Sequence, residues 1–116
     1  MKDFLLLIRT EGDVWTSLSP RQLQEHIDHG TAYIGNLMKD GKLKSAAPLD
    51  KGSRIVTSTN GIIKDGPFNE SKEVIAGYFH IVATDVQEAV EIAKANPIFK
   101  DIPTKIEVHV MKAVGG

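Results

Sequence analysis

The chain has 116 residues, and 41% of them are hydrophobic, which is enough to form the core of one domain over residues 1–116. Its 14 basic and 15 acidic residues are well mixed and give a net charge of −1, and this balance argues against strong electrostatic binding of nucleic acid, which needs a basic face. The absence of cysteine excludes disulfides, zinc–thiolate sites and thiol nucleophiles. The apolar run of residues 4–8 is too short for a signal sequence or a membrane span, so we expect a cytoplasmic protein without membrane contacts.

The first half of the chain predicts a strand followed by a helix. Residues 4–8 are apolar throughout, as in a strand that is buried on both faces. Ser19, Pro20 and Gln22 form the pattern of a capped helix start, and Gly41 is typical of a left-handed residue at a helix end, so we expect a helix over residues 20–40. Its core-facing stripe is predicted to consist of Leu23, Ile27, Ile34, Leu37 and Met38. The small residues Gly30 and Gly35 are expected to let a neighbouring strand approach the helix closely.

The second half predicts more strands and one further helix. A short strand over residues 43–49 is followed by a hairpin, residues 53–59 and 62–64, about the turn Asn60-Gly61. A long strand over residues 74–83 leads into a helix that is capped by Asp85 and stopped by Asn96-Pro97, and a last strand covers residues 104–111. This order predicts an α+β fold of the ferredoxin-like kind, an antiparallel sheet with two helices on one face.

The other face of the sheet then meets water or a partner. Strand alternation directs Ile75, Phe79 and Ile81 toward the helices and Tyr78, His80 and Val82 away from them. The helix-free face is also expected to carry Leu5, Leu7, Arg9, Glu107, His109 and Met111. This surface is too apolar to stay open and too polar for an ordinary core, so we predict a homodimer in which two such faces enclose a partly polar cleft.

This cleft is the predicted site for an unknown small molecule. His80 and His109 are candidate catalytic groups for proton transfer, as possible cross-strand neighbours, and Glu107 is placed to tune them. Arg9 suits an anionic group, and Tyr78 is expected to line the same continuous pocket. Trp15 is either a core plug or a pocket wall near the rim. The polar residues could equally form a satisfied interface network without a substrate, and without a local ligand spacing we predict no metal site.

The turn between the hairpin and the long strand carries the most distinctive motif. Asp65-Gly66-Pro67-Phe68 is followed by Glu70, Lys72-Glu73 and Gly77-Tyr78, and this pattern resembles the signature of the DGPF branch of the YCII-related proteins. Further similarity is found at residues 4–9, 18–20, 41–43, 48–49, 88–94, 96–98 and 107–108. The resemblance implies a small domain that dimerises into an α/β barrel around a shared cleft. We expect Asp65 first to hold the turn and then to act at the cleft rim.

The resemblance also bears on the histidines of the first helix. His26, His29 and Tyr33 share one flank of that helix, where His29 and Tyr33 are candidates for ligand binding. Some YCII-related proteins are thought to pair a histidine of this helix with an aspartate near the end of the second helix. His29 lies close to the matching position, but Asn96 stands in place of the aspartate, and an amide cannot stabilise an imidazolium by charge.

Three possible functions therefore remain open. The first is a cofactor-free small-molecule enzyme for proton transfer or a lyase-like reaction. The alternative is a non-catalytic ligand-binding or regulatory module, linked to sigma-factor-type transcription control because some relatives are encoded near, or fused to, such regulators. A purely structural dimer is the third possibility. A titratable pair with a perturbed pKa in the cleft would favour the enzyme.

Overall fold

The main sheet has four antiparallel strands in the order β2-β5-β1-β6. They are β1 (Lys2–Glu11), β2 (Leu43–Pro48), β5 (Glu73–Ala83) and β6 (Lys105–Val110). The computed structural model describes residues 1–12, 14–50, 52–66 and 73–113. The two longest strands, β1 and β5, lie in the middle of the sheet, so residues near both ends of the chain are brought together on it.

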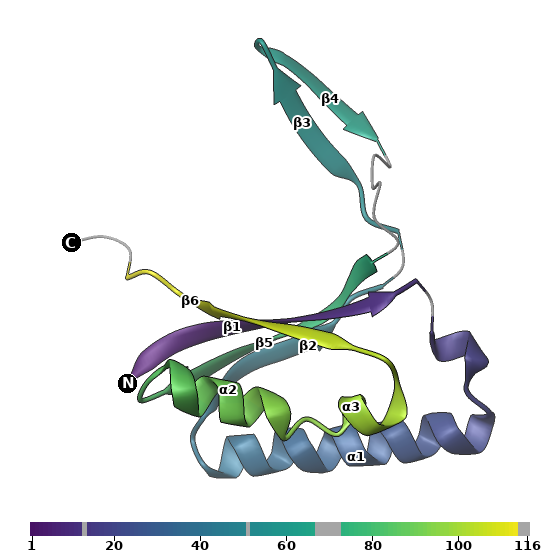
Figure 1. The fold of residues 1–116 in the computed structure, drawn as a ribbon, viewed down its shortest axis with the longest axis vertical. Coiled ribbons are helices and arrows are strands. Elements are labelled where there is room, and N and C mark those ends of the chain that lie inside the picture. Colours follow the sequence, from purple (N-terminus) through teal and green to yellow (C-terminus); the bar gives the residue numbers. More distant parts are fainter. Residues whose placement is uncertain (13, 51, 67–72, 114–116) are drawn as a thin grey trace.

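The helices all lie on one face of this sheet (Figure 1). They are α1 (Pro20–Lys39), α2 (Val86–Lys94) and the short α3 (Ile98–Asp101), and a 3-10 turn, η1 (Trp15–Ser17), follows β1. At the start of α1 the predicted capping box is confirmed: the Gln22 backbone N–H donates to Ser19 Oγ at 3.1 Å, and the Ser19 N–H donates to Gln22 Oε1 at 2.9 Å. The predicted α+β class is confirmed, and the sheet of the single chain is open rather than closed into a barrel.

A separate hairpin projects away from this layered body (Figure 1). Its strands β3 (Ile55–Thr59) and β4 (Ile62–Gly66) pair only with each other in the described residues. Asn60 and Gly61 have φ angles of 51° and 80°, the left-handed pair that a tight two-residue turn requires. The sequence predicted this hairpin, but not its separation from the main sheet. We call residues 55–66 the arm.

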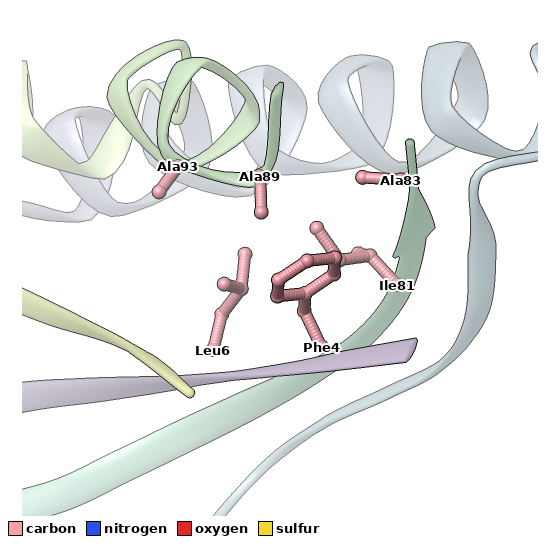
Figure 2. Close-up of a cluster of buried hydrophobic side chains, with 6 residues drawn as sticks. All are labelled: Phe4, Leu6, Ile81, Ala83, Ala89 and Ala93. Carbon is pink, nitrogen blue, oxygen red and sulfur yellow. The ribbon is translucent and has the colours of Figure 1, made fainter. Parts of the chain in front are cut away.

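The core lies between the sheet and α2 (Figure 2). Phe4, Leu6 and Ile81 point from the strands toward Ala89 and Ala93 of α2, and the alanines are small enough for the helix to sit close above the aromatic and branched side chains. A second cluster of Ile8, Ile98 and Ile102 fills the space under α3. Trp15 packs against this second cluster.

The predicted apolar stripe of α1 is wrong in part. Leu37 is buried, but Leu23, Ile27 and Met38 are 37%, 50% and 64% exposed. The inward side instead contains His26, Gly30, Tyr33, Ile34 and Leu37. The rotation of the helix is fixed by Tyr33, whose hydroxyl donates to the Ile92 carbonyl at 2.5 Å and whose ring lies 5.8 Å from that of Phe79.

The glycines of α1 do not mark a close contact. A Cβ atom built on Gly30 or Gly35 would have no neighbouring atom within 4 Å, apart from those of the helix's own turns. The expected close strand approach is therefore wrong at both positions. Close approach occurs instead at Gly77 of β5, where a Cβ would lie 3.0 Å from the Ala47 carbonyl oxygen of β2.

A β-bulge in β5 changes the face of one predicted residue. Ile8 pairs with Gly77, but the next residue of β1, Arg9, pairs with Ile75, so Ala76 is the extra residue. Ala76 packs toward the helix-side cluster, whereas Ile75 shares the helix-free face with Arg9. The prediction that Ile75 points to the core with Phe79 and Ile81 is therefore wrong, because strand alternation does not survive a bulge.

Candidate functional site

The helix-free face brings together most of the predicted site residues. Leu5 of β1 is opposite His80 on one side and His109 on the other. Leu7 is in the same way opposite Tyr78 and Glu107. The two histidines therefore belong to one face but are separated by β1, so they are not the cross-strand neighbours that the sequence suggested.

An ionic row crosses this face between β1 and β6. Arg9 Nε donates to Glu107 Oε2, and His109 Nε2 lies 3.2 Å from the other oxygen, Oε1, of the same carboxylate. The hydrogen bond from Arg9, followed by that from His109, holds the pKa of Glu107 below its usual range. Glu107 is therefore ionised at neutral pH and is committed to two partners.

His80, on the β5 side of β1, has a carboxylate partner of its own. Its Nε2 lies 2.8 Å from Asp3 Oδ1, and Lys44 Nζ lies 2.8 Å from the same oxygen. The hydrogen bonds from Lys44 and from His80 lower the pKa of Asp3, so this carboxylate is charged at neutral pH. A charged carboxylate orients an imidazole and stabilises its protonated form, which is the arrangement of a general acid–base histidine.

A hollow of about 610 Å³ opens beside this pair and is hereafter called the His80 hollow. His80 and Asp3 line it together with three lysines, Lys2, Lys44 and Lys112. Its remaining wall consists of Met1, Val110, Met111 and Ala113. Three cationic side chains against one carboxylate give the hollow a positive balance, which favours an anionic ligand.

A larger cavity of about 980 Å³ lies at the other end of the sheet. Its wall includes Arg9, Trp15 and Ile75, with Leu49 and Ile55 from the segments that lead to the arm. Trp15 lines this cavity and also packs on the second core cluster, so it has both of the roles that the sequence left open. The single chain thus divides the predicted pocket: Arg9 and Trp15 line the cavity, His80 lines the hollow, and Tyr78 and His109 line neither.

Asp65 lies away from these groups. It is part of β4 on the arm, where Oδ2 is 3.4 Å from Arg54 Nη2 and the side chain is 63% exposed. Residues 67–72 of the turn motif, with Pro67, Phe68, Glu70 and Lys72, lie outside the described residues. Within one chain the structure does not bring Asp65 to His80 or His109.

The first helix carries a second histidine–carboxylate pair, on the helix side. His26 Nδ1 is 2.8 Å from Asp101 Oδ2, and the His26 ring lies 4.8 Å from that of Trp15. His29 is 3.7 Å from the same oxygen and is half exposed. Tyr33, expected to contact a ligand, instead joins α1 to α2 through its hydroxyl, and burial raises its pKa to about 12. Its side chain lies between α1, α2 and the sheet rather than on the helix-free face.

One protein family matches nearly the whole chain. The family model of the YCII-related domain matches residues 3–112, which include the main sheet, the arm and all the helices. The chain belongs to the YCII-related family. A search of curated proteins gave no match.

In this YCII-related chain, the position expected for a helix-end aspartate has a structural role. Asn96 is buried, and its Oδ1 accepts a hydrogen bond of 3.0 Å from the Ile98 backbone N–H at the start of α3. The carboxylate that meets a helix-one histidine is Asp101, five residues further along the chain, and its closer partner is His26, with His29 further away. Sequence reasoning missed this pair because α3 was not predicted.

Two residues of the His80 hollow were also missed. Asp3 is found by strand alternation, since it shares the parity of Leu5, Leu7 and Arg9, but the first strand was predicted to begin at residue 4. Lys44 lies next to a register shift in β2, so no alternation pattern could place it. Within the described ranges, no three His, Asp or Glu side chains come close enough together to hold a metal ion. Among the described helices, none is long and apolar enough to cross a membrane.

Proposed function

We propose that this YCII-related protein is a cofactor-free cytoplasmic enzyme that transfers a proton on a small anionic molecule. The single observation that carries the proposal is the contact of 2.8 Å between His80 and Asp3 in the wall of the His80 hollow. His80 is only 25% exposed, so its ring is shielded from bulk water while it still borders the hollow. This combination suits a catalytic base better than a surface histidine does.

The proposed chemistry is abstraction of an acidic C–H proton next to a carbonyl group. Nε2 of His80 is held by Asp3, so Nδ1 is the ring nitrogen that accepts the proton. The C–H bond breaks, the new N–H bond forms, and the electron pair moves to the carbonyl oxygen as an enolate. The positive charges of the lysines around the hollow attract the substrate carboxylate and stabilise the developing enolate. The ionised Asp3 stabilises the imidazolium.

The proposal includes a homodimer in which the helix-free faces pack together, as a ferredoxin-like dimeric barrel of the DGPF branch. Leu5, Leu7 and Tyr78 form the half-buried middle of this face, with the Arg9–Glu107–His109 row beside them. A second face laid over them would bury the apolar side chains and exclude water from the hollow.

The alternative is a ligand-binding or regulatory module without turnover. It is favoured by the cavity of about 980 Å³, which is of a size that holds small ligands and has an arginine and a tryptophan in its wall. In that case a compound would bind near Arg9 and Trp15, and the His80 pair would only join β1 to β5. The link to sigma-factor-type transcription control belongs to this alternative.

Proton exchange in heavy water separates the two functions. A panel of 2-oxo and 3-oxo carboxylates is incubated in D₂O with the wild-type protein, and loss of the C–H signals is followed by ¹H NMR. We expect exchange with at least one compound, and we expect His80→Asn to reduce its rate by about 100-fold or more, as loss of a general base does. The matched control is His26→Asn, which alters the other histidine–carboxylate pair and should leave the rate unchanged.

Two other outcomes would change the proposed function. Loss of exchange in His26→Asn but not in His80→Asn would transfer the acid–base role to the helix side. Ligand binding by wild type without any exchange would support the regulatory module.

A further inference from the structure

Among the described residues, the arm pairs with no other strand of its own chain. A two-stranded hairpin is marginally stable in water unless a further strand or a packed surface supports it. Here β3 and β4 form a sheet of their own that projects from the body (Figure 1). A radius of gyration of 16.3 Å, against about 13 Å for a compact domain of this length, shows the same extended shape.

The arm also exposes large aliphatic side chains on both of its faces. Val56, Ile62 and Ile63 are 67%, 61% and 73% exposed. In the ladder, Ser58 pairs with Ile63 and Thr59 pairs with Ile62, so the two isoleucines near the tip point to opposite faces. Such a concentration of exposed aliphatic groups on a thin element is typical of a surface that a partner covers.

The total surface area indicates how large that partner contact is. The chain exposes 8264 Å², whereas a folded monomer of 12.7 kDa exposes about 6,200 Å². The excess of about 2,000 Å² for one chain corresponds to about 4,000 Å² for a pair, within the range of permanent homodimers. The arm, which projects from the body, adds to this exposed area.

A second copy of the same chain is the partner that these features fit. The arm is continuous with the helix-free face, because Ile55 at its base and Ile75 of β5 line the same cavity. The net charge of −1 imposes little repulsion between two copies. In a closed twofold dimer each arm can cover apolar surface on the other subunit, so both arms are satisfied at once.

We propose that the arm crosses to the other subunit of the homodimer, where surfaces of that subunit beside its helix-free face cover both faces of the arm and bury Ile62 and Ile63. The inference rests on the dimer of the proposed function, but it adds a second contact that the packing of two sheets does not require. It also gives a reason for residues 55–66 to form a hairpin that pairs with no other described strand of its own chain.

The test compares three variants by sedimentation velocity. Ile62→Lys combined with Ile63→Lys places two charges in the proposed arm contact, and we expect the dimer dissociation constant to rise by about 100-fold or more. Ile27→Lys changes a half-exposed aliphatic residue of α1 and should leave the dimer intact. Leu7→Lys changes the centre of the helix-free face. Circular dichroism checks that each variant is folded.

The outcomes separate the two proposals. If Leu7→Lys dissociates the dimer and the arm variant does not, the sheet-to-sheet dimer stands and the arm inference is overturned. If the wild type is a monomer, both are overturned.

A second measurement does not depend on a destabilising substitution. A photo-crosslinking residue at Ser58 is introduced into a chain that is mixed, after unfolding and refolding, with ¹⁵N-labelled wild-type chain. Crosslinks from the unlabelled arm to ¹⁵N peptides of β1, β5 or β6 are expected. Crosslinks within the unlabelled chain alone would contradict the inference.

Discussion

At the scale of single residues, Tyr33 shows that a side chain suited to ligand binding can have a structural role instead. Tyr33 shares a helix flank with two histidines and was a reasonable ligand contact on the sequence alone. In the structure its hydroxyl donates to the Ile92 carbonyl, and its ring packs near Phe79. It joins α1, α2 and the sheet, so its role is to fix the rotation of α1.

Replacement of Tyr33 by phenylalanine should therefore alter stability in a pH-dependent way. At neutral pH the lost hydrogen bond should cost about 1 kcal/mol of unfolding free energy. Because burial raises the pKa of Tyr33 to about 12 in the folded state, above about 10 in the unfolded state, its stabilisation is complete below pH 10 and is lost as the pH rises toward 12. Urea unfolding of both proteins between pH 7 and 11 should show the stability difference shrinking above pH 10. A difference that stays constant over this range would contradict the burial of the phenol.

The candidate site was predictable residue by residue only where strand alternation holds. Tyr78, His80, Glu107 and His109 lie on the helix-free face, as their parity indicated. Their partners were not predictable. Asp3, the partner of His80, lies one residue before the predicted start of the first strand. The pairing of His26 with Asp101 depends on α3, a helix that no sequence pattern predicted.

Among the elements, those determined by local contacts were predicted well. The ends of α1 follow from Ser19, Gln22 and Gly41, and the hairpin turn follows from Asn60-Gly61, because each of these signals acts within a few residues. The bulge at Ala76 and the rotation of α1 depend on contacts between distant segments, which a single sequence does not display. For the same reason the sequence predicted the arm as a hairpin but could not show that it stands apart.

The packing of β2 on β5 provides a test at this scale. A methyl group at Gly77 would lie 3.0 Å from the Ala47 carbonyl oxygen and 3.4 Å from Pro48 Cα, so β2 would have to move. We expect Gly77→Ala to lower the unfolding free energy by about 1–3 kcal/mol, as overpacking does. The control is Gly35→Ala on the open side of α1, which should raise stability by up to about 1 kcal/mol because glycine is a poor helix former. Chemical denaturation measures both, and a Gly77→Ala protein as stable as wild type would show that the two strands are not tightly packed.

At the scale of the whole molecule, the order of strands and helices was enough to predict the α+β class and a sheet with one uncovered face. The resemblance carried by Asp65-Gly66 and its surroundings led to the YCII-related family, which the match over residues 3–112 confirms. Sequence alone could not show how one chain distributes its site. Arg9 and Trp15 line the cavity at one end of the sheet and His80 lines the hollow at the other, because Arg9 lies near the end of β1 and Asp3, the partner of His80, lies near its start.

The central claim is that the helix-free face is a subunit interface that completes the site around His80 and Asp3. The most direct test is the mass of the wild-type protein in solution, measured by sedimentation equilibrium at about 10 μM, a concentration at which a dimer with an interface of this size is expected to be intact. The account predicts a single species of twice the chain mass of 12.7 kDa. A species of 12.7 kDa that does not associate when the concentration is raised tenfold would contradict it.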